Sequence, residues 1–285
     1  MSEYSTRMNG LSGSATREIL KLTALPEMIS FAGGLPATQC LPVKEIREIT
    51  ADILSGAGAT GALQYGLSEG VPAFREQLKD FLSDVGIKVS STDNLFVVSG
   101  GQQGIDLMCK VFLDKGDVVL VENPTYLAFL QITATYEARV VGVESDKQGL
   151  VLSDLEEKIK KHKPKFIYVV PTFSNPTGRS YTAENRRGIA YLADKYGVMV
   201  LEEDPYSRLR FTGDFVPALK SYDISDKVVY VTSFSKILSP GLRVAVMAGG
   251  KEVIRKLVIA KQGTDLHTAS LSQLIACEYL KRGYL

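Results

Sequence analysis

From residue 95 onward, short runs of β-branched and apolar residues alternate with longer amphipathic stretches. The runs that we predict to be strands cover residues 95–99, 118–121, 139–143, 166–170, 198–201 and 228–232. Strands separated by helices pair in parallel, because each helix returns the chain to the same end of the sheet, and helices then cover both faces. The pattern therefore predicts a three-layer α/β/α fold with a mostly parallel central sheet.

Two of the intervening helices indicate where the core lies. One follows the first strand, and another begins at Thr182 and ends at Gly197. Their apolar stripes consist of Ile105, Met108, Cys109 and Phe112, and of Ile189, Leu192, Ala193 and Tyr196. This helical spacing predicts packing against the sheet. Functional residues are expected directly after the strands, because open α/β sheets bind ligands beyond the carboxyl ends of their strands.

The segment before residue 95 is organised differently. It contains a short helical stretch near 15–22, the turn-rich FAGGLPATQCLP, a predicted helix at 43–54 and the glycine-rich GAGATGALQYG. We interpret this part as an arm that wraps around something. At the other end of the sequence, SLSQLIACEYLKRGYL is predicted to form one helix.

The composition excludes several classes of protein. Lys plus Arg is 33 against 32 for Asp plus Glu, so bulk charge does not favour a nucleic-acid or membrane binder. The three cysteines form no CxxC pair and the two histidines are far apart, so no metal site is predicted. No apolar run approaches the length of a membrane-spanning helix. We expect a cytoplasmic protein with reduced thiols.

The most informative motif is VYVTSFSKILSPGLRVA, in which a strand ends at hydroxyl-bearing residues. Thr232, Ser233 and Ser235 are followed by Lys236, and Arg243 comes seven residues later. A nearby cation and partial burial favour the neutral amine of a lysine, which can attack a carbonyl, and arginine offers a planar fork for a phosphate. The motif thus suggests a Schiff-base lysine beside an anion site. Taken alone, it is also compatible with an ordinary loop lysine.

Three further motifs follow strands. In SGGQQG (99–104), a glycine turn precedes a helix whose free amides can bind an anion, although such turns often only connect a strand to a helix. In PTFSNPTG, Asn175 directly follows a strand, where its amide can donate to a phenolate-type oxygen. In VLEEDPYSRLRF, a buried strand is followed by Glu202, Glu203 and Asp204 and then by Tyr206. Buried carboxylates need a partner, and a protonated pyridine nitrogen would be such a partner.

These four motifs together resemble the class I/II aminotransferases, which are pyridoxal-phosphate-dependent enzymes of fold type I, and in particular the α-aminoadipate and kynurenine aminotransferase subgroup. ATREILKL, SFAGGLP, LQYGLSEGVPAFRE and NPTY also stand in the family's order, so that the resemblance covers essentially the whole chain. The order of several motifs is far more specific than any one of them.

The resemblance implies a role for each site residue. Lys236 would form the Schiff base with pyridoxal phosphate and then act as general base and acid. The phosphate would be held by Gly101, Gln102, Ser233, Ser235 and Arg243, and by Tyr65 of a neighbouring subunit in a homodimer with shared active sites. The ring's 3′-oxygen would be held by Asn175 and Tyr206. Tyr126 would lie against the ring face, or serve ordinary packing.

Two departures from the family pattern carry expectations of their own. The aspartate expected three residues before Tyr206 is here Glu203; Asp204 is adjacent but out of register, and since strand neighbours point to opposite faces only one of the two can face the cofactor. We keep both as candidates and favour Glu203. The family also continues for on the order of a hundred residues into a small domain that supplies an arginine for the substrate's α-carboxylate.

We expect that C-terminal small domain to be absent from this chain, which would then bind the cofactor but turn over poorly. Residues 1–45 are assigned to an N-terminal arm and substrate-side segment, and residues 46–285 to the large cofactor-binding domain. Within the arm, Arg17 and Gly34 are candidate substrate-binding residues, and Arg17 matches the position at which relatives that accept acidic side chains present an arginine.

The predicted activity is transfer of an amino group from an amino acid (2-aminoadipate, glutamate, an aromatic or a branched-chain residue) to a 2-oxo acid such as 2-oxoglutarate, an EC 2.6.1-type reaction. The alternatives are another pyridoxal-phosphate enzyme, such as a β-lyase or decarboxylase, and a cofactor-binding remnant with little turnover. A ligand sensor fused to a DNA-binding module is disfavoured, because no helix-turn-helix precedes the arm.

Overall fold

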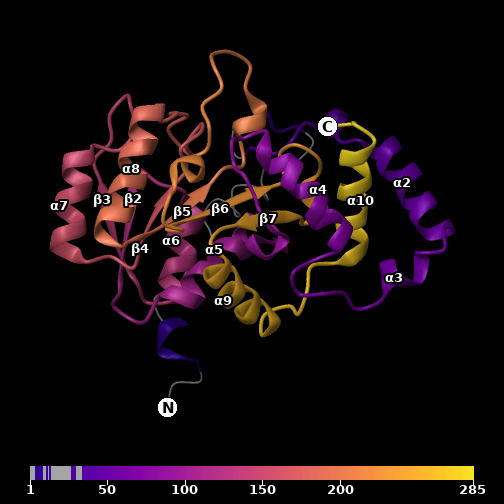
Figure 1. Ribbon diagram of the computed structural model, residues 1–285, viewed down its shortest axis with the longest axis horizontal. Coiled ribbons are helices and arrows are strands. Elements are labelled where there is room, and N and C mark those ends of the chain that lie inside the picture. The colour runs from indigo at the N-terminus through magenta and orange to yellow at the C-terminus, as the bar shows by residue number, and fades with distance from the viewer. Residues whose placement is uncertain (1–3, 9–10, 12, 14–26, 30–33) are drawn as a thin grey trace.

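The computed structural model describes residues 4–8, 11, 13, 27–29 and 34–285 (Figure 1). The helix expected near 15–22, with Arg17, lies outside the described residues. The boundary expected at residue 45 falls inside helix α2 (Val43–Ser55), so this helix is continuous across it. The division into arm and large domain therefore stays a prediction.

One seven-stranded sheet forms the centre of the protein, in the order β1-β7-β6-β5-β4-β2-β3. Its strands are β1 (Leu95–Val98), β2 (Val118–Glu122), β3 (Arg139–Val143), β4 (Phe166–Val169), β5 (Met199–Glu203), β6 (Val228–Ser233) and β7 (Ala245–Ala248). Neighbours from β6 to β3 pair in parallel, whereas β7 pairs antiparallel with both β1 and β6. All six predicted strands are confirmed, and so is the mostly parallel sheet.

The strand β7 was not predicted. It follows β6 without a crossover helix, through the loop that carries Lys236 and a short 3₁₀ turn, η6 (Pro240–Leu242). A connection this short can only return the chain antiparallel to β6. The four residues AVMA are all buried, but no amphipathic stretch separates them from β6, so the alternation of apolar runs and helices did not mark them as a strand.

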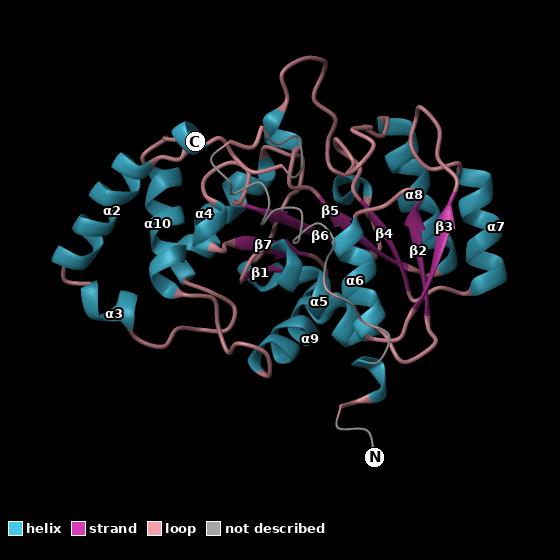
Figure 2. Cartoon of the chain, turned by 180° about the vertical axis from the view of Figure 1, so that it is seen from behind, coloured by secondary structure: helices cyan, strands magenta, loops and turns pink. Residues whose placement is uncertain are grey.

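Helices cover both faces of the sheet and complete the predicted three layers. One face is covered by α5 (Gly101–Phe112), α6 (Leu127–Thr135) and α9 (Lys251–Gln262), which Figure 2 shows side by side. The other face is covered by α7 (Leu152–His162) and α8 (Ala183–Tyr196) over one half and by α4 (Pro72–Ser83) and α10 (Ser270–Lys281) over the other. Helix α2 packs on α10 from outside, and α3 (Ala59–Leu63) lies beside both.

Local sequence explains where α8 begins and ends. The Thr182 side chain accepts a hydrogen bond from the Asn185 amide and caps the first turn. Gly197 ends the helix in the left-handed conformation (φ 67°), which favours glycine. Ile189, Leu192 and Ala193 are buried beneath it, so the predicted stripe is core. The glycine-rich segment GAGATGALQYG (56–66) contains the short helix α3.

No helix in the described part of the chain is both long and apolar enough to cross a membrane.

Candidate active site

A pocket of about 200 Å³ lies beyond the carboxyl ends of β4, β5 and β6, beside the start of α5. It is lined by Gly101, Gln102, Tyr126, Val170, Asn175, Glu203, Pro205, Tyr206, Ser233, Ser235, Lys236, Pro240 and Arg243. Every predicted catalytic and cofactor-binding residue except Asp204 and Tyr65 is on this pocket wall. The four motifs, spread over more than 140 residues of sequence, therefore meet at one edge of the sheet.

The loop that carries Lys236 is anchored on both sides of the lysine. Phe234 is buried, with its ring stacked on Phe81 at 5.0 Å, and its carbonyl accepts the amide of Leu238 at 2.9 Å. Lys236 itself is half-buried, and its Nζ donates to the Gly34 carbonyl at 2.6 Å. Burial lowers the pKa of the Lys236 amine, which increases the share of the neutral, nucleophilic form.

A cation and a helix start form the anion-binding side of the pocket. Arg243 adopts a left-handed conformation (φ 53°) and lies against Gly100, the residue before α5. Its guanidinium makes long contacts to the Ser235 hydroxyl (3.4 Å), the Pro240 carbonyl (3.3 Å) and the Ser99 carbonyl (3.5 Å). Since these contacts are weak, most of its donor capacity is available to an anion beside the free amides of α5.

The close approach of Arg243 requires glycine at position 100. An ideal Cβ there would lie 2.7 Å from Cζ of Arg243 and closer still to Nη2, and the backbone φ is +89°. We expect Gly100→Ala to weaken equilibrium binding of pyridoxal phosphate about tenfold or more, because the guanidinium is displaced from the anion site. Absorbance titration of the cofactor-free protein measures this.

Gly116→Ala is the matched control for that variant. Gly116 has nearly the same φ (+86°), but a Cβ there meets nothing within 4 Å. It carries the backbone strain without touching Arg243, so cofactor affinity should stay within about twofold of the unsubstituted protein. Equal losses in both variants would show that strain, and not the arginine, is responsible.

The turn with Asn175 is tied to the end of β2. The Ser174 amide donates to the Arg179 carbonyl at 2.7 Å, and the Ser174 carbonyl accepts the Gly178 amide at 2.6 Å. These two hydrogen bonds close the NPTG turn. Glu122, at the end of β2, accepts hydrogen bonds from the Ser174 hydroxyl at 2.6 Å and from Arg179 at 3.2 Å. This anchoring, which sequence reasoning missed, holds Asn175 at the pocket.

Asn175 and Tyr206 act as a pair. Burial raises the pKa of the Tyr206 phenol, and its hydrogen bond with Asn175 works in the opposite direction. Both side chains can donate to one oxygen in the pocket, as expected for a phenolate-type ligand.

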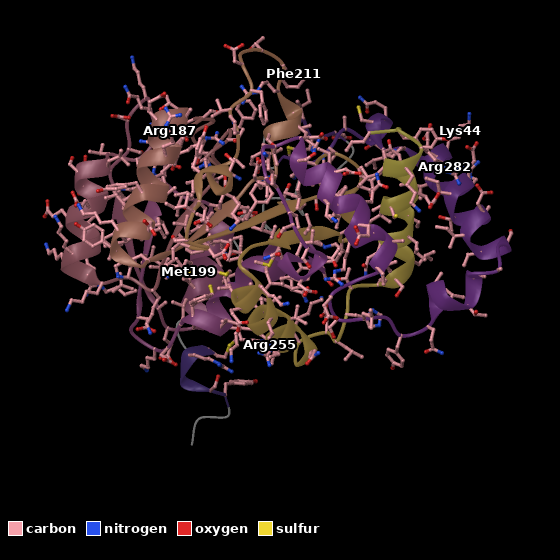
Figure 3. The ribbon with its side chains drawn as sticks, viewed as in Figure 1. Lys44, Arg187, Met199, Phe211, Arg255 and Arg282 are labelled. Atoms are coloured by element: carbon pink, nitrogen blue, oxygen red, sulfur yellow. The ribbon has the colours of Figure 1, made fainter. Side chains whose placement is uncertain are left out.

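Beyond Tyr206 the chain leads into a loop with Phe211, 96% exposed, whereas Met199 at the start of β5 lies inside the molecule (Figure 3). Strand β5 therefore points its carboxyl end at the pocket and this loop.

The three carboxylates at the end of β5 alternate between the two faces of the sheet. Glu203 faces the pocket, accepts a hydrogen bond from the buried Tyr168 hydroxyl, and lies over Gly101. Asp204 faces away, where it accepts the Tyr230 hydroxyl at 2.9 Å. Glu202 also faces away, and the backbone amides of Leu219 and Lys220, in the 3₁₀ turn η5 (Leu219–Tyr222), donate to its two oxygens at 2.7 Å. Of the two candidates for the cofactor, only Glu203 is presented to the pocket, because residues 203 and 204 are strand neighbours.

Burial raises the pKa of the Glu203 carboxyl to about 7, and Asp204 behind it adds to that shift. The Tyr168 hydrogen bond works against it by favouring the charged form. A carboxyl poised in this way becomes fully charged when a cationic partner, such as a protonated ring nitrogen, enters the pocket.

The remaining predicted residues lie outside this pocket. Tyr65 is 80% exposed, and its ring meets His267 edge-on at 5.9 Å, which leaves its predicted contact with a neighbouring subunit as a prediction. Gly34 reaches the site through its carbonyl on Lys236. Among the described residues, no group of three His, Cys, Asp or Glu side chains could hold a metal ion.

Beneath the anion site lies a polar network that sequence reasoning missed. Lys261 on α9 is fully buried, and its Nζ donates to Gln103 Oε1 at 2.8 Å and to both carboxylate oxygens of Asp265 at 2.8 and 3.0 Å. Gln103 and Asp265 in turn bind the amide and hydroxyl of Ser99, both at 2.7 Å. The network therefore fixes the residue before the Gly100 turn.

These residues fit pyridoxal phosphate in charge and in chemistry. The arginine, the hydroxyls and the helix amides suit a phosphate, the half-buried lysine suits an aldehyde, and the buried carboxyl suits a protonated ring nitrogen. The absence of a Cβ at Gly100 is required for the arginine that completes the set.

Comparison with known proteins gives the same result. Residues 26–282 match the family model described as aminotransferase class I and II. The chain is 40% identical to aromatic-amino-acid aminotransferase 1 of Thermococcus litoralis, over 99% of this chain and 69% of that protein. It is 38% identical to 2-aminoadipate transaminase of Thermus thermophilus, over 96% and 68%. The crystal structure of Pyrococcus horikoshii kynurenine aminotransferase, solved with PMP, superposes with a TM-score of 0.92 at 40% identity, over 99% of this chain and 70% of that one.

The chain therefore belongs to the class I and II aminotransferases, enzymes of fold type I that depend on pyridoxal phosphate. The fold, the enzyme class and the cofactor expected from the sequence motifs are confirmed at the level of the family.

Proposed function

We propose that this chain binds pyridoxal phosphate in the pocket around Lys236 and transfers an amino group between an amino acid and a 2-oxo acid. The observation that carries the proposal is the meeting of Lys236, Arg243 and Glu203 on one pocket wall. An amine, an anion-binding cation and a buried carboxyl correspond to the three reactive regions of this cofactor.

Each residue has a role that follows from its position. Arg243, the hydroxyls of Ser233 and Ser235 and the first amides of α5 bind the phosphate. Asn175 and Tyr206 donate to the ring oxygen, and Tyr126 lies against the ring face. Glu203 provides the negative charge that keeps the ring nitrogen protonated.

When bound, pyridoxal phosphate supplies an electron sink for the pair of electrons left at the substrate Cα. Lys236 would hold the cofactor by its aldehyde through Nζ. As a free amine, the same Nζ would accept the proton of the substrate Cα and return it later in the transfer. Burial lowers the pKa of Lys236, which favours the neutral amine that can accept a proton.

The proposed donors are 2-aminoadipate, glutamate and aromatic or branched-chain amino acids, with 2-oxoglutarate as acceptor. Support comes from the relatives, which include an aromatic-amino-acid and a 2-aminoadipate aminotransferase. Arg17 and Gly34 are the proposed substrate-side residues. A homodimer in which Tyr65 reaches the partner's phosphate belongs to the same proposal, as does the arm of residues 1–45 with a large domain of 46–285.

Separate half-reactions test the function. Cofactor-free protein is titrated with pyridoxal phosphate and then mixed with each amino acid, while absorbance follows conversion to the pyridoxamine form. We expect stoichiometric loading, conversion with release of the 2-oxo acid, and reversal by 2-oxoglutarate. Release of ammonia and pyruvate would identify a lyase instead, and failure to load would refute the cofactor site.

A further inference from the structure

The hydrogen bond from Tyr168 to Glu203 is a polar contact at the pocket that the proposed roles do not explain. The Tyr168 hydroxyl on β4 donates to Oε2 of Glu203 at the end of the adjacent strand β5. Both side chains are on the sheet face that α5 and α6 cover, and Tyr168 is fully buried. The other oxygen, Oε1, lies 3.3 Å from where a Cβ on Gly101 would stand, at the pocket wall.

The Tyr168 ring has little freedom to move. It stacks on Phe129 of α6 with a centroid distance of 3.8 Å and an interplanar angle of 6°. Phe129 in turn meets Phe166 edge-on at 6.3 Å and is itself fully buried. A ring packed on a second buried ring keeps one rotamer, so its hydroxyl has a fixed place.

A fixed hydroxyl matters because glutamate has one more rotatable bond than aspartate. Without a hydrogen-bond partner, the Glu203 side chain could rotate its carboxyl away from the pocket. The groups that act on Glu203 are the phenols of Tyr168 and Tyr206, which face it, and the carboxylate of Asp204 behind the strand. Tyr168 is the one of these that favours the charged carboxylate.

We infer that Tyr168 is a positioning residue that acts through Glu203: its hydroxyl holds Oε2 so that Oε1 is presented to the ring nitrogen of pyridoxal phosphate. This inference rests on the proposed function for the identity of the ligand. It assigns to Tyr168 no contact with substrate or cofactor.

The test compares two tyrosines that donate to neighbouring carboxylates. Tyr168→Phe removes the hydroxyl and keeps the stacked ring. The matched control is Tyr230→Phe, because Tyr230 is equally buried and donates to Asp204 on the opposite face. Both variants lose one buried hydrogen bond, so their thermal stabilities should fall by similar amounts.

Two readouts separate positioning from stability. Equilibrium titration with pyridoxal phosphate should show about tenfold weaker binding for Tyr168→Phe and less than twofold for Tyr230→Phe. In cofactor-free protein, infrared titration of the Glu203 carboxyl, identified by its loss in Glu203→Gln, should show a pKa raised by about one unit in Tyr168→Phe and unchanged in Tyr230→Phe.

A double variant completes the design. On a Glu203→Gln background, Tyr168→Phe should cause no further loss of cofactor affinity, because the positioned group is already gone. Equal effects of the two tyrosine variants, or a tenfold loss that persists on that background, would overturn the inference. If the unsubstituted protein binds no pyridoxal phosphate, the proposed function fails. If the pKa of the Glu203 carboxyl is unchanged in Tyr168→Phe, only the inference about Tyr168 is refuted.

Discussion

Replacing Lys236 by alanine should reduce the rate of the amino-donor half-reaction by at least about 10³-fold. This variant lacks the half-buried amine that is proposed to bind the aldehyde and carry the proton, and the described pocket holds no second lysine that could replace it. Arg243 and the α5 amides remain, so the variant should still bind pyridoxal phosphate, though more weakly. Stopped-flow absorbance after loading, with glutamate or 2-aminoadipate as donor, measures the rate.

Two further variants show what causes that loss of rate. Lys236→Arg keeps a positive charge but has no amine that can form the covalent bond, so it should be as inactive as the alanine variant. Lys256→Ala removes an exposed lysine of α9 and should leave the rate unchanged. A Lys236→Ala rate within tenfold of the unsubstituted protein would mean that another group moves the proton.

The elements that the sequence predicted well are those with a repeated pattern. The six strands were predictable because a longer amphipathic stretch separates each apolar run from the next, and the stripes of α5 and α8 because their apolar residues recur at helical spacing. Strand β7 was not, since it follows β6 through a loop with no amphipathic helix between the two strands. The outer helix α3 arises in a glycine-rich stretch that propensity disfavours.

For the site, the rule that ligands bind beyond the carboxyl ends of strands located the pocket-lining residues from motifs alone. Because neighbouring residues of a strand point to opposite faces of the sheet, only one of Glu203 and Asp204 can face the pocket. Which of the two does so depends on the register of β5. The structure places Glu203 there, in agreement with the spacing to Tyr206.

The supporting polar groups could not be predicted in the same way. Tyr168 belongs to a buried strand and resembles any core aromatic in sequence, and its partner is 35 residues away. Lys261 offered one signal: it continues the stripe of Ile254, Leu257 and Val258 at the next helical position, where a charge is unexpected. A lysine on a buried stripe requires a partner, although sequence alone does not identify Asp265 and Gln103.

That buried lysine leads to the second large effect. Lys261→Met should lower the free energy of unfolding by about 2 kcal/mol, because it removes the hydrogen bonds that Nζ donates to Asp265 and leaves Gln103 Oε1 with the Ser99 amide as its donor. For a chain of this size, that corresponds to a melting temperature lower by roughly 4–8 °C. Thermal or urea unfolding of the cofactor-free protein measures the change.

The same variant should weaken binding of pyridoxal phosphate, because Gln103 and Asp265 hold Ser99, whose carbonyl contacts Arg243. Lys110→Met is the matched control. Lys110 donates to Thr264, the neighbour of Asp265, but it is exposed, so its loss should change stability by less than about 0.5 kcal/mol.

A double variant tests whether the unpaired charge, and not the lost packing, causes the instability. Adding Asp265→Asn to Lys261→Met removes the remaining charge and should restore about 0.5 kcal/mol, since the Asp265 carboxylate is partly exposed and its unpaired charge stays hydrated. Cofactor affinity should stay low in the double variant, because the Lys261 ammonium that holds Gln103 and residue 265 beside Ser99 is still missing. A double variant that is less stable than Lys261→Met would instead show that Asp265 stabilises the Ser99 turn independently of Lys261.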